Sequence, residues 1–328
     1  MIFVTGGSGL IGSFLIPALL GQGYTVKALY RGQVPSIKGA DQVQWVEGDI
    51  LDPVFLRNAL QEVQYVFHCA GLVSYAPQDK ELLKQVNIEG TANMVDACLE
   101  HGGVKLCHVS SIAAVGRPKG VQTLTENSKW DASVEHSAYA SSKYLGELEV
   151  WRGIAEGLEA VIVNPSVVLG PSDWNRSSTQ LFKYVYNERT FYTQGSANFV
   201  DVRDVTEAMM KLTFSEITGE RFILNAEQVS YKDFFKGVAV GFDKKAPSVK
   251  VPPALAEVVW RLEHARTWFT GGRPLITKDT ARVSGKNHLF SNEKVREAIG
   301  INFRPVAESI AWVCDGLKEQ KASAPEFR

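Results

Sequence analysis

A tyrosine and a lysine are spaced so that they could act together on a proton. Tyr139 and Lys143 stand four residues apart in the run Tyr-Ala-Ser-Ser-Lys. Residues four apart on a helix share a face, so the phenol and the ammonium would point the same way. A phenol titrates near ~10, and a nearby ammonium lowers that pKa by favouring the phenolate. The pair therefore predicts a general acid/base, although the same spacing is also typical of a surface pair.

Two adjacent serines end an apolar run upstream of this pair. Ser110 and Ser111 follow Leu-Cys-His-Val, which is typical of a buried strand. Ligands bind open α/β sheets beyond the carboxyl ends of the strands, so a hydroxyl here could hold a substrate oxygen while Tyr139 moves its proton. We favour Ser111 for this role, with Ser110 as the competing candidate. Both hydroxyls could instead satisfy the backbone of a turn.

Glycines with the spacing GxxGxxG lie between the expected first strand and the expected first helix. A sharp turn out of a strand and a close approach to a pyrophosphate both need residues without a Cβ. A helix beginning near Leu10 would direct its free N–H groups at the phosphates. We therefore predict dinucleotide contacts from Gly6, Ser8, Gly9, Leu10, Ile11 and Gly12. The alternative is a tight turn that binds nothing.

The end of the expected second strand bears on which dinucleotide binds. NAD-binding proteins usually place an acid there to bond the ribose hydroxyls, whereas this chain has Arg31, followed seven residues later by Lys38. A guanidinium attracts the 2′-phosphate of NADP, so NADP(H) is favoured and NAD(H) is the alternative. Arg31 could instead stack on the adenine without selecting the phosphate. Asp49 and Ile50, after the third expected strand, could bond and pack against the adenine, unless Asp49 is an exposed turn acid.

Two alternating periodicities predict the elements that position these side chains. β-Branched and aromatic runs predict strands at 2–5, 25–30, 43–46, 65–69, 106–109 and 160–163. Stretches of helical length lie between them at 11–22, 53–61, 79–101 and 137–155. This alternation predicts an α/β fold with a Rossmann-type, doubly wound, mostly parallel sheet. A further strand–helix pair is expected at 198–214 and a strand at 221–224, and the chain from about 229 reads as mainly helical.

The length of 328 residues allows one large α/β domain or two domains. We predict a dinucleotide-binding domain formed by residues 1–165 plus 199–226. A smaller, mainly helical substrate-binding part would comprise residues 166–198 plus 227–328.

Charge and composition narrow the partners and the compartment. Lys and Arg number 35 against 36 Asp and Glu, and this balance lacks the concentrated basic field that nucleic-acid binding requires. No apolar run approaches the roughly 18 residues of a membrane span. The four cysteines form no CxxC pair, and the N-terminus shows no charged leader. We therefore expect a cytoplasmic protein with a small-molecule substrate, no nucleic-acid partner, no membrane insertion and no metal site.

Taken together, these motifs resemble those of extended short-chain dehydrogenases/reductases, in the NAD-dependent epimerase/dehydratase superfamily. The resemblance runs from residue 1 to about 215, with the motifs in the family's order. Besides the glycine turn, the serines and the Tyr–Lys pair, the matching segments are Asp49, 68–71, 87–91, 164–171 and 200–205.

The resemblance implies roles for individual residues. Tyr139 would be the general acid/base, Lys143 would bond the nicotinamide ribose and bias Tyr139, and Ser111 would orient the substrate oxygen. Asn87 would be mainly structural. Backbone contacts along the nicotinamide and its ribose would come from Ala70, Gly71, Leu72, Pro165, Val167 and Val168. The family also implies a possible homodimer through helices near 85–101 and 137–155.

Two segments point to different subfamilies. Residues 23–31, Lys38 and 164–165 resemble dihydroflavonol 4-reductases, which use NADPH, whereas residues 290–300 resemble 3β-hydroxysteroid dehydrogenases and sugar epimerases. We expect an NADP(H)-dependent oxidoreductase acting on CH–OH groups, which reduces a ketone or aldehyde or oxidises the matching secondary alcohol. An NAD-retaining nucleotide-sugar epimerase and a non-catalytic NADP-binding sensor or regulator remain alternatives.

Aromatic residues bear on the substrate. As a set they favour an apolar or ring-bearing small molecule, while core packing is the alternative for each one. The set comprises Trp174, Phe182, Tyr184, Tyr186, Phe191, Tyr192 and Phe199, and later Trp260, Trp268 and Phe269.

Overall fold

The computed structural model describes residues 1–118, 120–176, 178–251 and 288–323, which fall into two compact units. Unit 1 comprises Met1–Ser166, Val202–Leu224 and Phe290–Asn302. Of the described residues, unit 2 contains 167–201, 225–251, 288–289 and 303–323.

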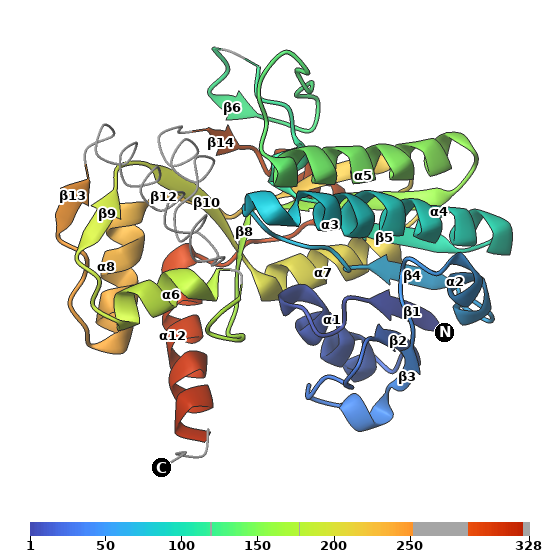
Figure 1. The fold of residues 1–328 in the computed structure, drawn as a ribbon, viewed down its shortest axis with the longest axis horizontal. Helices are drawn as coiled ribbons and strands as arrows, with labels where there is room; N and C mark the ends of the chain where they lie inside the picture. Colours follow the sequence, from blue (N-terminus) through green and yellow to red (C-terminus); the bar gives the residue numbers. More distant parts are fainter. Residues whose placement is uncertain (119, 177, 252–287, 324–328) are drawn as a thin grey trace. The chain divides into compact units, whose positions relative to one another are not determined.

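Unit 1 is built on a seven-stranded sheet in which every neighbouring pair of strands is parallel (Figure 1). The strand order across the sheet is β3 (Gln44–Glu47), β2 (Val26–Tyr30), β1 (Ile2–Thr5), β4 (Tyr65–His68), β5 (Lys105–Val109), β7 (Glu159–Pro165) and β11 (Glu220–Leu224). The order reverses direction between β1 and β4, and such a switch point is where open α/β sheets bind ligands. The predicted doubly wound parallel sheet is confirmed.

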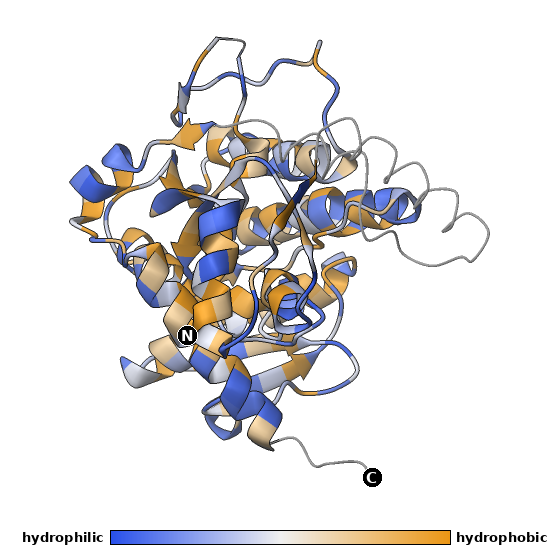
Figure 2. Ribbon diagram, turned by 90° about the vertical axis from the view of Figure 1, so that its left-hand side faces the viewer, coloured by the Kyte–Doolittle hydropathy of each residue, from blue (hydrophilic) through white to orange (hydrophobic). Residues whose placement is uncertain are grey.

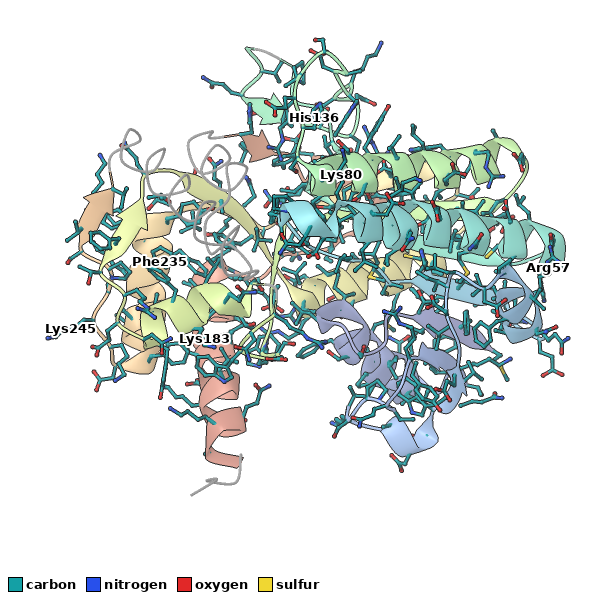
Figure 3. The ribbon with its side chains drawn as sticks, viewed as in Figure 1. Arg57, Lys80, His136, Lys183, Phe235 and Lys245 are labelled. Atoms are coloured by element: carbon teal, nitrogen blue, oxygen red, sulfur yellow. The ribbon has the colours of Figure 1, made fainter. Side chains whose placement is uncertain are left out.

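Helices cover both faces of this sheet. On one face, α1 (Leu10–Gly21) packs against α7 (Val202–Thr213). On the other, α4 (Gly90–His101) packs between α2 (Pro53–Ala59) and α5 (Ala138–Ala155). The helices carry both hydrophilic and hydrophobic residues, as Figure 2 shows, because one side of each faces the sheet. Figure 3 labels Arg57 on α2 and Lys80, the first residue of α3 (Lys80–Lys84).

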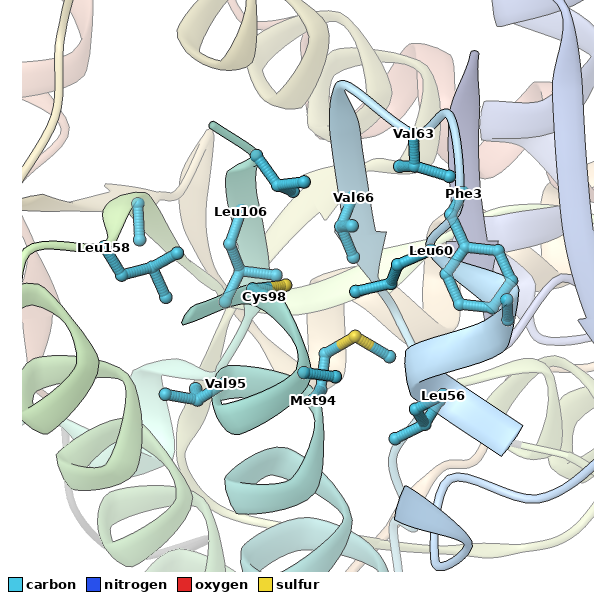
Figure 4. Packing of buried hydrophobic residues seen from close by; sticks show 14 of the residues in the cluster. Phe3, Leu56, Leu60, Val63, Val66, Met94, Val95, Cys98, Leu106 and Leu158 are labelled. Atoms are coloured by element: carbon cyan, nitrogen blue, oxygen red, sulfur yellow. The ribbon is translucent and has the colours of Figure 1, made fainter. Parts of the chain in front are cut away.

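The core under α2 and α4 consists of residues from alternate strand positions. Phe3, Val66 and Leu106 of three neighbouring strands meet Leu56 of α2 and Met94 of α4 (Figure 4). All five side chains are fully buried. Burying a side chain of this size stabilises a fold by roughly 1.5–3 kcal/mol, so this cluster fixes the strands whose ends carry the candidate site.

Smaller elements complete unit 1. Short helical turns lie at η1 (Ala40–Gln42), η2 (Pro77–Asp79), η3 (Gln85–Glu89) and η4 (Ile112–Ala114). Phe290, in β14 (Leu289–Phe290), packs with Leu124 of β6 (Thr123–Leu124). The next helix, α11 (Glu293–Ile299), packs against β11. The predicted single helix over 79–101 is interrupted, because η3 is a π-helical turn between α3 and α4.

The described residues of unit 2 form three helices and several short strands. A three-stranded sheet contains β8 (Val167–Leu169), β10 (Ser196–Asp201) and β12 (Glu227–Ser230), and a two-stranded sheet pairs β9 (Phe191–Thr193) with β13 (Val249–Val251). The helices are α6 (Thr179–Tyr186), α8 (Tyr231–Phe242) and α12 (Val306–Ser323). α8 packs against both α6 and α12. The sequence pattern did not predict β8, β9, β12 or β13, which have three or four residues each, whereas it predicted the strand–helix pair at 198–214 that corresponds to β10 and α7.

The aromatic residues between 174 and 199 form much of the core of unit 2. Phe182 and Phe199 are fully buried, and Phe199 stacks on Phe234 with ring centroids 4.6 Å apart. Trp174 lies edge-on to Tyr186 at 5.0 Å. Phe182 and Phe199 are therefore core residues, as the alternative interpretation stated. These two rings do not support a ring-bearing substrate. Trp260, Trp268 and Phe269 lie outside the described residues.

The boundaries of the two units differ from the predicted domains at four places, of which two involve one or two residues only: Ser166 belongs to unit 1, and residues 225–226 belong to unit 2. Residues 290–302 belong to unit 1, although we placed them in the second part, because α11 packs on β11 and Phe290 joins the core around Leu124. Residues 199–201 belong to unit 2, because β10 pairs with β8 and β12 rather than with the large sheet.

The four cysteines are free thiols, with Cys98, Cys107 and Cys314 buried and Cys69 half-buried. In the part of the chain that the structure describes, no three His, Cys, Asp or Glu side chains form a group that could hold a metal ion. Within the same residues, no helix has both the length and the apolar character needed to cross a membrane.

Candidate functional site

The predicted chemical groups of unit 1 follow strands that end side by side. Thr5 of β1 is in register with His68 of β4, and His68 is in register with His108 of β5. The glycine turn, the 69–72 segment and the serine pair follow these strands in order. Parallel strands end at one edge of the sheet, so the topology brings together groups that are far apart in sequence.

The glycine turn follows β1 and is closely packed. Gly6 has a φ of +70°, and a Cβ on it would lie 2.6 Å from the backbone N of Ala70. A Cβ on Gly12 would lie 2.3 Å from the carbonyl oxygen of Gly6. Contacts this short exclude a side chain at either position. Part of the glycine pattern is therefore explained by packing alone, as the tight-turn alternative states.

The N-terminus of α1 adds an observation that packing does not explain. Its N-cap residue, Gly9, has no side chain to accept a bond from the first turn, and that turn contains no acidic residue. Ser8 and Gly9 are exposed, and Leu10 and Ile11 are half-buried. Free backbone N–H groups at the positive end of a helix favour an anion, so these residues fit the pyrophosphate of a dinucleotide.

Arg31 follows β2 directly and forms an ion pair that the sequence did not indicate. Its Nη1 lies 3.3 Å from Oδ2 of Asp49, and both side chains are exposed. Oδ1 of Asp49 accepts the backbone N–H of Leu51 at 3.0 Å, which fixes the carboxylate. An exposed pair of this kind contributes about 0–1 kcal/mol, so the guanidinium remains available to a more strongly charged partner.

Lys38 and Ile50, two further residues predicted to contact the cofactor, differ in exposure. Lys38 is exposed. Ile50 is buried in the core of unit 1, where a Cβ on Gly90 would lie 2.5 Å from its Cδ1. The backbone carbonyl of Ile50 accepts a bond from Asn93 Nδ2 at 3.1 Å. The side chain of Ile50 is thus held by the protein core, whereas the predicted adenine contact of residues 49–50 stays a prediction.

Tyr139 and Ser111 come together at the edge of the sheet. Tyr139 lies in the first turn of α5 and is 8% exposed. Contrary to the lowering that we expected from a nearby ammonium, the pKa of the phenol is raised by burial, and hydrogen bonding with Ser111 opposes that rise. Ser111 Oγ also accepts the backbone N–H of Ala113 at 3.1 Å, so the turn alternative describes part of what this hydroxyl does. A phenol with a raised pKa keeps its proton at neutral pH and can donate it.

Ser110 has a different partner. Its hydroxyl donates to Oε2 of Glu147 at 2.7 Å, deep in unit 1. The two adjacent serines are thus separated by their contacts, because Ser111 faces the phenol and Ser110 faces a buried carboxylate. This arrangement supports the choice of Ser111 over Ser110.

Lys143 lies one turn after Tyr139 and is buried. Its Nζ donates to the carbonyl oxygen of Val109, the last residue of β5, at 2.8 Å. A Cβ on Gly71 would lie 3.3 Å from the same Nζ, so the 70–72 segment runs directly past the ammonium. Burial lowers the pKa of Lys143 to about 8, although the carboxylate of Glu147 raises it.

Asn87 fixes the 70–72 segment in place. Its Oδ1 accepts the backbone N–H of Leu72 at 2.7 Å, and its Nδ2 donates to the Leu72 carbonyl oxygen at 2.9 Å. The same Nδ2 donates to Ser142 of α5 at 2.9 Å. Gly146 admits the Asn87 carbonyl, since a Cβ there would lie 2.2 Å from that oxygen. These contacts agree with the structural role that we expected for Asn87.

The last three predicted cofactor contacts are divided between the units. Pro165 ends β7 in unit 1, whereas Val167 and Val168 belong to β8 in unit 2. Val167 and Val168 pair with Phe199 and Val200 of β10. The contacts predicted for all three with the nicotinamide and its ribose stay predictions.

Sequence reasoning missed a buried carboxylate on α5. Glu147 lies one turn beyond Lys143, and its side chain is 2% exposed. It accepts bonds from Ser110, Asn164, Trp151 and Arg221. The available signal was its spacing, because positions 139, 143 and 147 lie on one face of a helix.

The fold and the site together define a class of protein. A doubly wound parallel sheet with a glycine turn and an uncapped helix at its switch point is typical of dinucleotide-binding proteins. Residues 2–222 match the family described as the NAD dependent epimerase/dehydratase family. The chain belongs to this family, whose members depend on nicotinamide dinucleotides.

The curated relatives include reductases of similar length. A "Putative dihydroflavonol 4-reductase" from Synechocystis sp. is 29% identical over 317 residues, covering 94% of this chain and 92% of the relative. A "Cinnamoyl-CoA reductase 1" from Oryza sativa subsp. japonica is 30% identical over 345 residues, covering 99% and 92%. The match to extended reductases confirms the resemblance seen in the sequence.

Solved structures show the same fold. The crystal structure of gox2253 superposes with a TM-score of 0.82 at 30% identity, covering 98% of each chain. A UDP-glucose 4-epimerase from Thermotoga maritima, solved with UDP-glucose, superposes with a TM-score of 0.79 at 18% identity, covering 98% of this chain and 99% of that one. At that lower identity the likeness concerns the fold alone.

Proposed function

We propose that this protein is an NADP(H)-dependent oxidoreductase that reduces a ketone or aldehyde to the alcohol, or runs the reverse reaction. The observation that carries the proposal is the meeting of Ser111, Tyr139 and Lys143 at the carboxyl edge of the sheet. The names of the dihydroflavonol and cinnamoyl-CoA reductases support the reductive direction.

Each residue of the site has its own role in a carbonyl reduction. A bound reduced nicotinamide supplies the hydride. Ser111 holds the substrate oxygen, and Tyr139 gives its proton to the alkoxide that forms when the carbonyl carbon has accepted the hydride. Because burial raises the pKa of Tyr139, the phenol still carries this proton at neutral pH. Lys143, held at Val109, supplies positive charge beside the site and stabilises the phenolate that remains.

The cofactor assignment rests on Arg31. A guanidinium at the end of the second strand can form paired, charge-assisted hydrogen bonds to a 2′-phosphate. Among the first residues after β2 there is no acid that would bond the ribose hydroxyls instead. Asp49 already pairs with Arg31, which places a competing carboxylate beside the predicted phosphate position.

The substrate class is proposed as an apolar or ring-bearing carbonyl compound. The buried aromatic residues of unit 2 no longer support it. The support that remains is the printed names of the reductase relatives, which denote dihydroflavonol and cinnamoyl-CoA reduction.

The test is NADPH consumption by the purified protein with a panel of aromatic, alicyclic and aliphatic carbonyl compounds. Tyr139→Phe should lower turnover about 10²- to 10⁴-fold, the usual contribution of a general acid, while NADPH still binds. Tyr144→Phe is the matched control, because this tyrosine of α5 stacks on Trp130 with ring centroids 4.2 Å apart and should tolerate the change.

The outcomes separate the alternatives. Unchanged turnover in Tyr139→Phe would exclude the proton-donor role. Tightly held NAD that copurifies with the protein, together with interconversion of sugar nucleotides, would establish the epimerase alternative. Cofactor binding without turnover of any carbonyl compound or sugar nucleotide would establish the sensor alternative.

A further inference from the structure

A single carboxylate joins the elements that carry the candidate catalytic groups. Oε2 of Glu147 accepts Ser110 Oγ and Asn164 Nδ2, each at 2.7 Å. Oε1 accepts Arg221 Nη1 at 2.8 Å and Trp151 Nε1 at 3.3 Å. The donors come from the ends of β5 and β7, from β11 and from α5 itself. Four donors at hydrogen-bonding distance fill the acceptor sites of an ionised carboxylate.

The two bonds to Oε2 lie next to residues of the candidate site. Ser110 immediately precedes Ser111, and Asn164 immediately precedes Pro165. Asn164 Nδ2 donates a second bond, at 3.0 Å, to the carbonyl oxygen of Ser111. Glu147 is therefore linked to the backbone of Ser111 both through Ser110 and through Asn164, and it lies one helical turn from Lys143.

The charge of Glu147 is compensated within unit 1. A buried carboxylate is costly without a partner, and Arg221 supplies the partner. The guanidinium is itself fixed, since its Nε donates to the carbonyl oxygen of Glu126 at 2.9 Å. The arrangement is costly to desolvate, and apolar residues could fill such a position at least as well, so stability alone does not account for it.

The groups around Lys143 show what this charge can do. Burial lowers the pKa of His68 to about 3 and that of His108 well below its ordinary value, so both rings are neutral. Burial also raises the pKa of the Cys69 thiol and of the Tyr139 phenol, which keeps both protonated. Glu147 raises the pKa of Lys143, because the negative charge of its carboxylate favours the protonated ammonium.

We propose that Glu147 is a positioning residue for the reaction, which holds Ser111 against Tyr139 and sets the charge of Lys143. The proposal rests on the proposed reductase function. Glu147 touches neither the substrate nor the cofactor in this role. It acts through Ser110 and Asn164 on the backbone, and through its charge on the ammonium.

Glu147→Gln is the decisive variant, because it keeps the size of the side chain and removes the charge. Its amide nitrogen cannot accept a bond, so whichever carboxylate oxygen it replaces loses both of its donors. We expect kcat to fall about ten- to a hundredfold through misplacement of Ser111, with KM for NADPH nearly unchanged. The alkaline limb of the kcat profile should move to lower pH, because Lys143 loses its proton earlier.

A direct titration of Lys143 makes the test independent of turnover. In protein labelled with ¹³C at the lysine ε-carbons, the Lys143 resonance is assigned by its absence from Lys143→Met. Its midpoint, about 8 in the native protein, should move to lower pH in Glu147→Gln. If the native protein reduces no carbonyl compound but this shift appears, the proposed function has failed while the charge effect of Glu147 stands.

Two further variants complete the design. Glu149→Gln is the matched control, because this carboxylate of α5 is 31% exposed and bonds Arg152, so kcat and the titration should not change. Glu147→Asp keeps the charge with a shorter reach and should retain the native alkaline limb with a reduced kcat. A merely structural role would lower activity in Glu147→Gln without moving either the limb or the Lys143 midpoint, and that result would overturn the proposal.

Ser110→Ala tests the positioning role of Glu147 if Glu147→Gln does not fold. It removes one bond to Oε2 and leaves the charge, so the Lys143 midpoint should stay while kcat falls severalfold. A native kcat in Ser110→Ala would overturn the positioning role.

Discussion

The proposed preference for NADP over NAD rests on one residue, Arg31. The sequence identified it by its place after the second strand, and the structure adds its ion pair with Asp49 at 3.3 Å. No periodicity could have indicated that pair, because residues 31 and 49 lie on loops after neighbouring strands and meet only through the parallel pairing of β2 with β3. At the scale of the residue, the sequence identified the guanidinium of Arg31, and the tertiary structure identified the Asp49 carboxylate that competes with a phosphate for it.

Replacing Arg31 tests this assignment. Arg31→Ala should raise the Kd for NADPH about tenfold or more, the loss expected for hydrogen bonds between charged groups, and should change the Kd for NADH much less. Asp49→Asn should tighten NADPH binding, because it frees the guanidinium and removes a negative charge. Both constants can be measured by titrating the fluorescence of the reduced nucleotide.

Arg57→Ala is the control for Arg31→Ala. Arg57 is an exposed arginine at the outer end of α2, where it pairs with Glu100 (Figure 3). Its removal should leave both dissociation constants unchanged. Equal weakening of NADPH and NADH by Arg31→Ala would show that the guanidinium does not read the 2′-phosphate.

The element that bears most on the proposed cofactor site is α1 with its glycine turn. The sequence predicted the turn and the helix from glycine spacing alone, and both are present. What the spacing could not tell is which glycine serves packing and which leaves room for a ligand. The structure shows that Gly6 and Gly12 are required by backbone atoms within 3 Å of a would-be Cβ, whereas at Gly9 the nearest atom is 3.2 Å away.

Two alanine substitutions in α1 test this constraint. Gly12→Ala would place a Cβ 2.3 Å from the Gly6 carbonyl oxygen, so the turn must shift. We expect a destabilisation of about 1–3 kcal/mol, typical of an overpacked site, and loss of dinucleotide binding. Thermal unfolding and fluorescence titration measure the two effects.

Gly21→Ala is the matched control within the same helix. A Cβ there would meet nothing within 4 Å, and alanine is the better helix former, so stability should rise by up to about 1 kcal/mol with binding unchanged. Native binding in Gly12→Ala would contradict the close packing of the turn.

At the scale of the whole molecule, buried ionisable groups lie close to the candidate site. The His68 ring bonds Thr5 Oγ1 at 2.8 Å and Thr91 Oγ1 at 3.3 Å, and it stacks on His108 with ring centroids 5.5 Å apart. Both rings are neutral because burial penalises the imidazolium. The sequence placed these histidines in strands, but only the sheet register stacks them on one another.

This burial predicts an acid limb of stability. The pKa of His68 is about 3 in the folded state and about 6.5 in the unfolded chain, so the unfolded state binds more protons between these values. The free energy of unfolding should therefore fall as pH decreases from 6.5, by on the order of 4 kcal/mol from His68 alone by pH 3. Denaturant unfolding measured at successive pH values follows the fall.

His68→Asn should be less stable than the native protein at pH 7 and should lose less stability on acidification. His101→Asn is the control, because His101 is exposed at the end of α4 and its replacement should leave the pH dependence unchanged. An unaltered acid limb in His68→Asn would show that other groups cause it.

The sequence by itself determined the parallel sheet, the glycine turn, the Tyr139–Lys143 spacing and the family. These follow from local patterns, because glycine positions and helical or strand periodicity are written into neighbouring residues. The tertiary structure decided the partners: Ser111 rather than Ser110 beside Tyr139, Asp49 beside Arg31, and Glu147 beneath Lys143. It also placed two of the aromatic residues, Phe182 and Phe199, in the core of unit 2 rather than in a substrate pocket. Arg31 and Asp49 are 18 residues apart in the sequence and Ser111 and Tyr139 are 28 apart, so only the order and register of the parallel strands, with the packing of α5, bring these partners together.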